Sequence, residues 1–180
     1  MSDVVAIVGR PNVGKSTLFN RLTESRSAIV DETSGVTRDR HYGEVIWGDK
    51  SFTLIDTGGM TRGADDRFES DINRQVNLAI EESSVVLFLV DVVTGITDFD
   101  EHIAKMLRKS KKEVILVINK VDNSQRMLET SVFYNLGMGD YFSISSTNGS
   151  GTGDLLDEVI DRMPNIEPDG EPEDRIPRFT

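Results

Sequence analysis

The chain has 180 residues, a formal net charge of −11 and no cysteine. This length suits one domain of ordinary size. The lack of cysteine excludes disulfides and zinc–thiolate sites and favours a reducing, cytoplasmic setting. The acidic balance argues against direct nucleic-acid binding by this domain alone, because attraction to phosphate would need a local basic patch. There is no basic and apolar leader and no apolar run of about 20 residues, so no membrane association is expected.

Short apolar runs alternate with amphipathic helical patterns along the chain. The runs at 4–8, 52–55, 85–90 and 114–118 are rich in Val, Ile, Leu or Phe, as buried parallel strands are. Patterns with apolar residues three and four apart lie at 18–22, 68–80, 99–107 and 155–163. Two shorter strands are expected, one at 43–47 that forms a hairpin with 52–55 and one at 141–144. The alternation predicts a doubly wound α/β domain over 1–163, with helices on both faces of a mostly parallel sheet.

The first strand leads directly into a phosphate-binding motif. Gly9-Arg-Pro-Asn-Val-Gly-Lys-Ser16 lies between that strand and the first helical pattern, which is the context of a P-loop. Glycines let backbone amides face phosphate oxygens, and the helix N-terminus adds a favourable dipole. Lys15 would reach the β and γ phosphates, Ser16 would coordinate Mg²⁺, and Thr17 would lie near the α phosphate. The candidate phosphate-binding residues are Gly9, Arg10, Pro11, Asn12, Val13, Gly14, Lys15, Ser16 and Thr17.

Two segments further along are candidates for switches that respond to the γ phosphate. Gly35-Val-Thr-Arg-Asp-Arg40 has few apolar anchors, and Thr37 is its candidate ligand for Mg²⁺ and the γ phosphate. Thr33 is close enough that spacing does not choose between the two threonines. Asp56 ends a strand ahead of two glycines, which suits a metal-linked carboxylate followed by a loop that meets the γ phosphate. The candidate nucleotide contacts here are Asp56, Thr57, Gly58, Gly59 and Met60. The predicted metal ligands are Ser16, Thr37 and Asp56.

A base-reading motif follows the strand at 114–118. Asn119-Lys-Val-Asp122 lies at the carboxyl end of that strand, where ligands collect in open α/β sheets. The Asp122 carboxylate can accept the N1–H and N2–H of guanine, whereas adenine has an acceptor at N1 and no 2-amino group. Asn119 would tie the segment to the P-loop, and the Lys120 stem would cover a face of the base. Backbone amides after the strand at 141–144 would reach guanine O6. The candidate base-binding residues are Asn119, Lys120, Val121, Asp122, Ser145, Ser146 and Thr147.

The composition changes after Met163. Residues 164–175 are acidic and rich in proline and have no apolar face, which predicts an extended linker. Residues 176–180 are more apolar, and either the beginning of another domain or an ordinary frayed end accounts for them. The short basic run Lys109-Ser-Lys-Lys112 is interpreted as a solvated face.

These motifs, in this order, resemble the translation-factor-related GTPases, and more closely the first G domain of the Der (EngA) family. The similarity covers 3–163 and includes the segments 8–20, 35–40, 56–59, 119–122 and the distinctive 133–139. It implies a Ras-like P-loop NTPase fold that binds GTP or GDP with Mg²⁺ and hydrolyses GTP to GDP and phosphate. It also implies a cytoplasmic protein with two tandem G domains and a KH-like domain, acting in assembly of the large ribosomal subunit. On this resemblance, 176–180 begin the second G domain.

Two positions depart from familiar patterns, and Asn12 offers an alternative for catalysis. Ser146 replaces an alanine, and little loss is expected because its backbone amide makes the contact. Met60 stands where Ras-like enzymes have a glutamine, and a thioether cannot orient water by hydrogen bonding. Relatives with asparagine at the position of Asn12 use its side-chain oxygen to help bind K⁺, which supplies transition-state charge; stabilisation of the loop turn is the structural alternative. The candidate catalytic residues are Lys15, Asn12, Thr37 and Gly59, and hydrolysis is expected to be slow in isolation and stimulated by K⁺.

Other functions remain as alternatives. A nucleotide-sensing docking module would bind GTP with negligible hydrolysis in isolation. A tRNA-modification GTPase shares Asn12 and the missing glutamine, although residues 133–139 and the acidic linker favour the Der family. An ATP-using kinase is opposed by Asp122. The expected partners are guanine nucleotide, the rest of a longer chain and, through that chain, the large ribosomal subunit.

Overall fold

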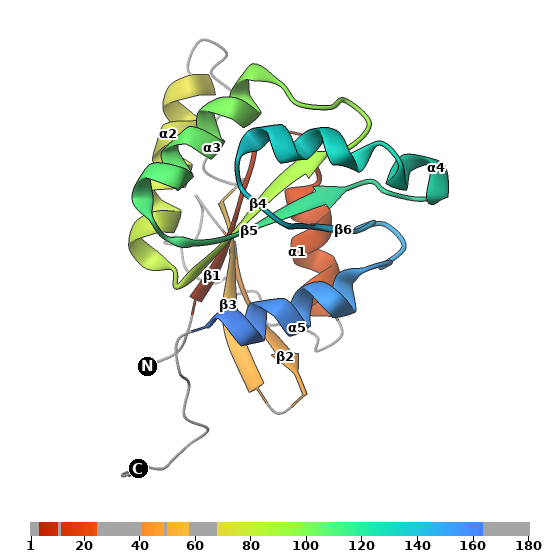
Figure 1. Cartoon of the computed structure of the whole chain (residues 1–180). Helices are drawn as coiled ribbons and strands as arrows, with labels where there is room; N and C mark the ends of the chain where they lie inside the picture. Colours follow the sequence, from red (N-terminus) through yellow and green to blue (C-terminus); the bar gives the residue numbers. More distant parts are fainter. Residues whose placement is uncertain (1–3, 11, 25–40, 49, 58–67, 164–180) are drawn as a thin grey trace.

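Strands and helices alternate in the computed structural model, which describes residues 4–10, 12–24, 41–48, 50–57 and 68–163 (Figure 1). The elements are β1 (Val4–Val8), α1 (Lys15–Glu24), β2 (His41–Trp47), β3 (Lys50–Asp56), α2 (Phe68–Glu82), β4 (Val85–Asp91), α3 (Asp98–Ser110), β5 (Glu113–Asn119), α4 (Ser124–Met127), the 3₁₀ helix η4 (Thr130–Leu136), β6 (Tyr141–Ser143) and α5 (Thr152–Arg162). No helix in these ranges is long and apolar enough to cross a membrane.

The six strands form one sheet in the order β2-β3-β1-β4-β5-β6. Only β2 and β3 are antiparallel, and they form the expected hairpin, with Val45 opposite Phe52. All other neighbours are parallel. Parallel strands end at the same edge of a sheet, so the carboxyl ends of β1, β3, β4 and β5 lie together. That edge is where ligands bind in open α/β folds.

Successive side chains of each central strand enter two different cores. In β4, Val85, Leu87 and Leu89 pack with α1 and α5, whereas Val86, Phe88 and Val90 pack with α2, α3 and η4. Every residue of this strand is buried, as a strand covered on both faces requires. Figure 1 shows the two pairs of helices, α1 with α5 and α2 with α3, on either side of the sheet. The doubly wound architecture predicted from the sequence is confirmed.

The segment between β5 and β6 contains two elements that the sequence pattern does not indicate. The α4 helix has only four residues, and the Asn123 side chain caps it by accepting the N–H of Arg126 at 2.9 Å. The following η4 buries Phe133 and Leu136, which are three residues apart, and ends at Gly137 in the left-handed region. A 3₁₀ helix repeats every three residues, so its apolar positions do not follow the period of an α-helix. Residues 164–180, with the predicted linker, lie outside the described residues.

Candidate functional site

The P-loop leaves the buried end of β1 and turns into α1. A Cβ atom at Gly9 would lie 2.7 Å from the Leu89 carbonyl oxygen, so only glycine fits beside β4. Gly14 has a φ of 105°, which L side chains rarely adopt, and a Cβ there would overlap the side-chain amide of Asn119. The N–H of Leu18 bonds to the Gly14 carbonyl at 2.9 Å and closes the first helical turn. The loop therefore presents the N-terminus of α1 at the ligand edge of the sheet.

The Lys15 amine is buried inside this loop. Its Nζ donates to the carbonyl oxygens of Gly9 at 2.8 Å and Arg10 at 3.0 Å, and the residue is only 7% exposed. Burial lowers the pKa of Lys15 to about 8, although the Asp56 carboxylate opposes that shift. A phosphate chain at the loop would supply a stronger, anionic acceptor for the amine.

Ser16 and Asp56 converge from α1 and the end of β3. The Ser16 hydroxyl donates to Oδ2 of Asp56 at 3.0 Å, and Asp56 is 1% exposed. A hydroxyl and a carboxylate are hard oxygen donors of the kind that Mg²⁺ prefers, and that ion usually keeps waters and substrate phosphates as its other ligands. Among the residues that the structure describes, no group of three His, Cys, Asp or Glu could hold a metal ion. The donor set thus fits a cation shared with a bound phosphate and offers no all-protein cage.

Thr57 holds the end of β3 against its neighbours. Its hydroxyl lies 2.7 Å from the Ile7 carbonyl oxygen and 3.2 Å from Oε1 of Gln75, and the residue is fully buried. Any nucleotide contact from Thr57 would therefore come from its backbone. The other candidates around the two switches, Thr33, Thr37, Gly58, Gly59 and Met60, and Pro11 of the P-loop lie outside the described residues.

Asn119 joins three segments through one buried amide. Its Nδ2 donates to the Val13 carbonyl at 2.8 Å, and its Oδ1 accepts from the backbone N–H and the hydroxyl of Ser146, each at 2.9 Å. The residue is 2% exposed, so these bonds are shielded from water. The P-loop, the end of β5 and the loop after β6 are consequently held in fixed relation. The sequence predicts a contact from the Ser146 amide to the base, whereas here both its N–H and its hydroxyl donate to Asn119.

Lys120 and Asn12 face each other across the ligand edge. Lys120 Nζ lies 3.0 Å from Oδ2 of Asp91, at the end of β4, and 3.3 Å from the Asn12 carbonyl oxygen. Both Lys120 and Asn12 have positive φ values, 69° and 72°. Asparagine tolerates the left-handed region better than most residues, so the loop conformation alone gives Asn12 a structural role. The Lys120 stem is thereby directed along the edge of the sheet above the P-loop.

Asp122 is exposed, and its carboxylate is oriented by the loop after β6. Oδ1 of Asp122 accepts from the Ser145 hydroxyl at 2.7 Å, while Ser145 itself is fully buried. Arg21 of α1 supports the same loop, because Nε donates to the Ser146 carbonyl at 3.1 Å and Nη2 donates to that of Thr147. Arg21 is not predictable from the sequence, since nothing in a helical pattern indicates a contact with a loop 125 residues away.

Arg10 of the P-loop contacts the segment after β4 and the beginning of α3. Its Nε lies 3.4 Å from Oδ1 of Asp100, and its Nη2 donates to the hydroxyl of Thr94. Asp100 is fully buried and forms a reciprocal capping box with Thr97, whose N–H donates to Oδ2 of Asp100 at 2.9 Å. Burial raises the pKa of Asp100, although Thr97 and Arg10 oppose that shift. The Thr-x-x-Asp spacing was a readable signal for the cap, whereas the pairing with Arg10 was not.

Comparisons with known proteins agree with this geometry. The family model described as 50S ribosome-binding GTPase matches residues 4–120. GTPase Der of Christiangramia forsetii is 57% identical and that of Flavobacterium psychrophilum 58% identical over 179 residues, which is 99% of this chain and 41% of each relative. The chain thus spans about two fifths of the length of these curated relatives. The resemblance to the Der family that was inferred from the motifs is confirmed.

Two solved structures place the fold. An Aquifex aeolicus Era variant bound to GDP·AlF₄⁻ has a TM-score of 0.71 and 28% identity, over 93% of this chain and 59% of that one. Era in complex with MgGDPNP and nucleotides 1506–1542 of 16S ribosomal RNA has a TM-score of 0.72 and 27% identity, over 97% and 60%. These similarities confirm the predicted fold class, a Ras-like P-loop domain.

Proposed function

This chain belongs to the 50S ribosome-binding GTPase family, and we propose that it binds GTP and GDP with Mg²⁺ and hydrolyses GTP to GDP and phosphate. The chain covers 41% of its curated relatives, so the role of a longer protein is part of the proposal. That role is a nucleotide-dependent switch in assembly of the large ribosomal subunit, in the cytoplasm, together with a second G domain and a KH-like domain.

The Asn119 network is the observation that carries the proposal. A P-loop alone fits any nucleoside triphosphate, but here Asn119 bonds both to Val13 of the P-loop and to Ser146 beside the base-reading carboxylate. Asp122 is fixed in turn by Ser145. One rigid frame therefore carries a phosphate-binding element and a carboxylate suited to the two N–H donors of guanine. The Lys120 stem would lie over the base.

Hydrolysis is assigned to charge stabilisation at the P-loop rather than to a side-chain base. The Lys15 amine would leave the Gly9 and Arg10 carbonyls to hold the β and γ phosphates. The backbone N–H groups of the residues from Asn12 to Thr17 would surround the phosphate chain. Ser16 and Asp56 would hold Mg²⁺, Ser16 directly and Asp56 close by. When bound, that ion neutralises charge on the β and γ oxygens. Thr37, or Thr33 in its place, and the amide of Gly59 are the proposed γ-phosphate contacts.

A potassium ion is the proposed source of additional transition-state charge. Asn12 is exposed in the loop, so its side chain is accessible to a cation beside the phosphates, and Met60 offers no hydrogen bond to an attacking water. The left-handed backbone of Asn12 supports the structural alternative equally well. Equal hydrolysis rates in KCl and NaCl would exclude the potassium role and leave the turn as the reason for this asparagine.

Single-turnover hydrolysis tests the function. The protein should bind GTP and hydrolyse it slowly alone and faster with large ribosomal subunits, and Lys15→Met should abolish hydrolysis in both conditions. A protein that binds GTP tightly but shows no hydrolysis in either condition would instead be a nucleotide-sensing docking module. Acceleration by tRNA and not by subunits would favour a tRNA-modification GTPase.

A further inference from the structure

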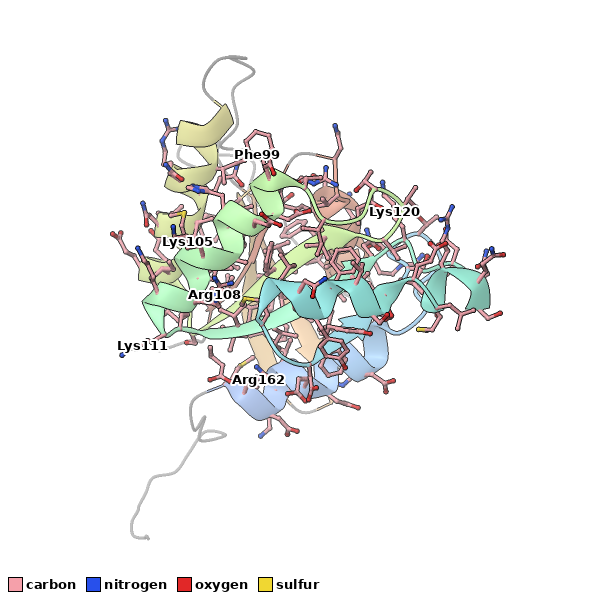
Figure 2. All side chains as sticks on the ribbon, turned by 45° about the horizontal axis from the view of Figure 1, so that its top comes forward. Phe99, Lys105, Arg108, Lys111, Lys120 and Arg162 are labelled. Carbon is pink, nitrogen blue, oxygen red and sulfur yellow. The ribbon has the colours of Figure 1, made fainter. Side chains whose placement is uncertain are left out.

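A row of positive charge lies away from the nucleotide edge, on the C-terminal half of α3. Lys105, Arg108 and Lys111 follow one another at intervals of three along this helix and its C-cap, and Arg162 of α5 lies on the same side of the molecule (Figure 2). We call the surface formed by Lys105, Arg108, Lys109, Lys111, Lys112 and Arg162 the basic strip. It adjoins Glu113, the first residue of β5, so it lies toward the sheet edge opposite the P-loop.

The strip is hollowed rather than flat. One depression of about 260 Å³ lies between α3 and η4. It is lined by Glu101, Ala104, Lys105, Arg108, Asn135 and Leu136. A second, of about 280 Å³, is lined by residues of both ends of the strip and by the turn after η4: Arg108, Lys111, Lys112, Met138 and Arg162 are among them. Arg108 lines both depressions, so the two form one continuous basic surface.

The lysines of this surface outnumber the carboxylates beside them, which are Glu101 in the first depression and Glu113 in the second. Within the described ranges, no carboxylate forms an ion pair with Lys105, Lys109, Lys111 or Lys112, whereas Arg162 is paired with Glu158 and Glu113. The whole chain has 31 acidic and 20 basic side chains, so a group of lysines without acidic partners departs from its average. The run 109–112 was interpreted as an ordinary solvated face, but the fold adds Lys105, Arg108 and Arg162 to it.

The two arginines and the helix end are held in place. Arg108 Nη1 donates to the Leu136 carbonyl at 2.5 Å, and Arg162 Nη1 donates to that of Val114 at 3.0 Å. Lys111 caps α3 with a φ of 60°, a position that usually favours glycine. Cations near a helix C-terminus also stabilise its dipole, which accounts for Arg108 and Lys109. The same effect accounts for Arg162, in the last turn of α5. It is confined to the last turn of a helix, so it does not account for Lys105.

We propose that the basic strip binds the phosphate backbone of ribosomal RNA. Charges spread over two depressions suit a chain of phosphates better than a single anion, and lysines bind phosphate as point charges without reading bases. Ribosomal RNA is the polyanion that a 50S ribosome-binding GTPase would meet on the subunit. The inference rests on the proposed ribosomal role. The net charge of −11 makes the rest of the domain repel a polyanion. Binding by the strip alone is therefore weak, and it positions the domain on RNA. Strong binding needs the full-length protein.

The test compares two triple variants of the full-length protein that lose the same charge. The strip variant is Lys105→Gln, Lys111→Gln and Lys112→Gln. The control variant is Lys50→Gln, Arg74→Gln and Arg126→Gln, in β3, α2 and α4. Binding to large ribosomal subunits is measured by co-sedimentation with a GTP analogue over a series of salt concentrations. GDP affinity is measured in parallel for every protein.

The strip variant should bind subunits about tenfold or more weakly at low salt, and the slope of log K against log salt should become shallower by about 2 to 3, as expected for three lost phosphate contacts. The control variant should retain the wild-type slope, and all three proteins should bind GDP equally.

Crosslinking of wild-type protein on the subunit should join α3 to nucleotides. A strip variant that binds with the wild-type affinity and slope overturns the inference alone, and crosslinks from α3 only to ribosomal proteins overturn the assignment to RNA. Wild-type protein that binds GDP but no subunits overturns the ribosomal role together with the strip.

Discussion

The Nε atom of Arg10 lies 3.4 Å from a carboxylate oxygen of Asp100, which is fully buried at the beginning of α3. This ion pair joins the P-loop to the helix that follows β4. Two sets of contacts therefore hold the P-loop, one from Asn119 and Lys120 at the end of β5 and one between Arg10 and α3.

Removing Arg10 should destabilise the domain more than removing the charge it pairs with. Arg10→Ala leaves a buried carboxylate without its cation, and we expect a loss of about 3 kcal/mol in the free energy of unfolding. Asp100→Asn keeps the shape and removes the charge, so its loss should be smaller. Urea unfolding of both variants and of the double variant measures the coupling. Equal and additive losses would show that the pair contributes no interaction energy.

Asp100 should also give the stability a distinctive pH dependence. Burial raises the pKa of Asp100 in the folded state above its ordinary value of 3.8, so the folded protein binds this proton more tightly than the unfolded chain does. The contribution of the group is therefore lost as the pH rises through the folded-state pKa. Relative to Asp100→Asn, the wild type should gain stability as the pH falls from 7 toward 4. Parallel stability curves for the two proteins over that range would contradict this assignment.

Nucleotide binding should take up a proton above pH 8. In the free protein the pKa of Lys15 is lowered to about 8, and bound phosphates would favour the charged amine. Affinity for GDP should then fall as the pH rises through about 8, with a slope approaching one log unit per pH unit. Calorimetry at pH 8.5 in two buffers of different ionisation enthalpy measures the uptake directly. Lys15→Arg, whose side chain stays charged, is the control and should show a flatter profile. Binding by the wild type without proton uptake would show that Lys15 is already protonated.

The Asn119 side-chain amide should contribute far more to the stability of the domain than the Ser146 hydroxyl that bonds to it. Asn119→Ala leaves the buried carbonyl of Val13 and N–H of Ser146 without partners, and we expect a loss of about 2–4 kcal/mol in stability together with weaker GDP binding. Ser146→Ala removes one hydrogen bond while the backbone bond remains, so about 1 kcal/mol is expected. Chemical unfolding and GDP titration of both variants test this order. A loss for Ser146→Ala as large as that for Asn119→Ala would mean that the hydroxyl, and not the amide, holds the loop.

The order of strands and helices was predictable because it depends on local patterns. Buried parallel strands are continuously apolar, and the glycines and lysine of the P-loop follow β1 at a fixed spacing. The segment 124–136 was not predicted, since a four-residue helix and a 3₁₀ helix lack the period that identifies an α-helix.

The side-chain contacts between distant parts of the chain could not be predicted from the sequence patterns either. Arg10 meets Thr94 across 84 residues of chain, and Arg21 meets Ser146 across 125. An arginine can reach many partners, and only the folded sheet decides which is near. Asn119 was assigned to the P-loop in advance because its motif fixes that geometry, and its bond to Val13 has the expected form.

Competition between GDP and ADP measures the guanine specificity of the site. Equilibrium titration should show wild-type protein binding GDP at least about 10³-fold more tightly than ADP, because adenine leaves the Asp122 carboxylate unpaired. Asp122→Asn should weaken GDP binding by about 10²-fold, through the loss of two charge-assisted hydrogen bonds. Equal affinity of the wild type for GDP and ADP, or a GDP affinity that Asp122→Asn leaves unchanged, would show that Asp122 does not recognise guanine.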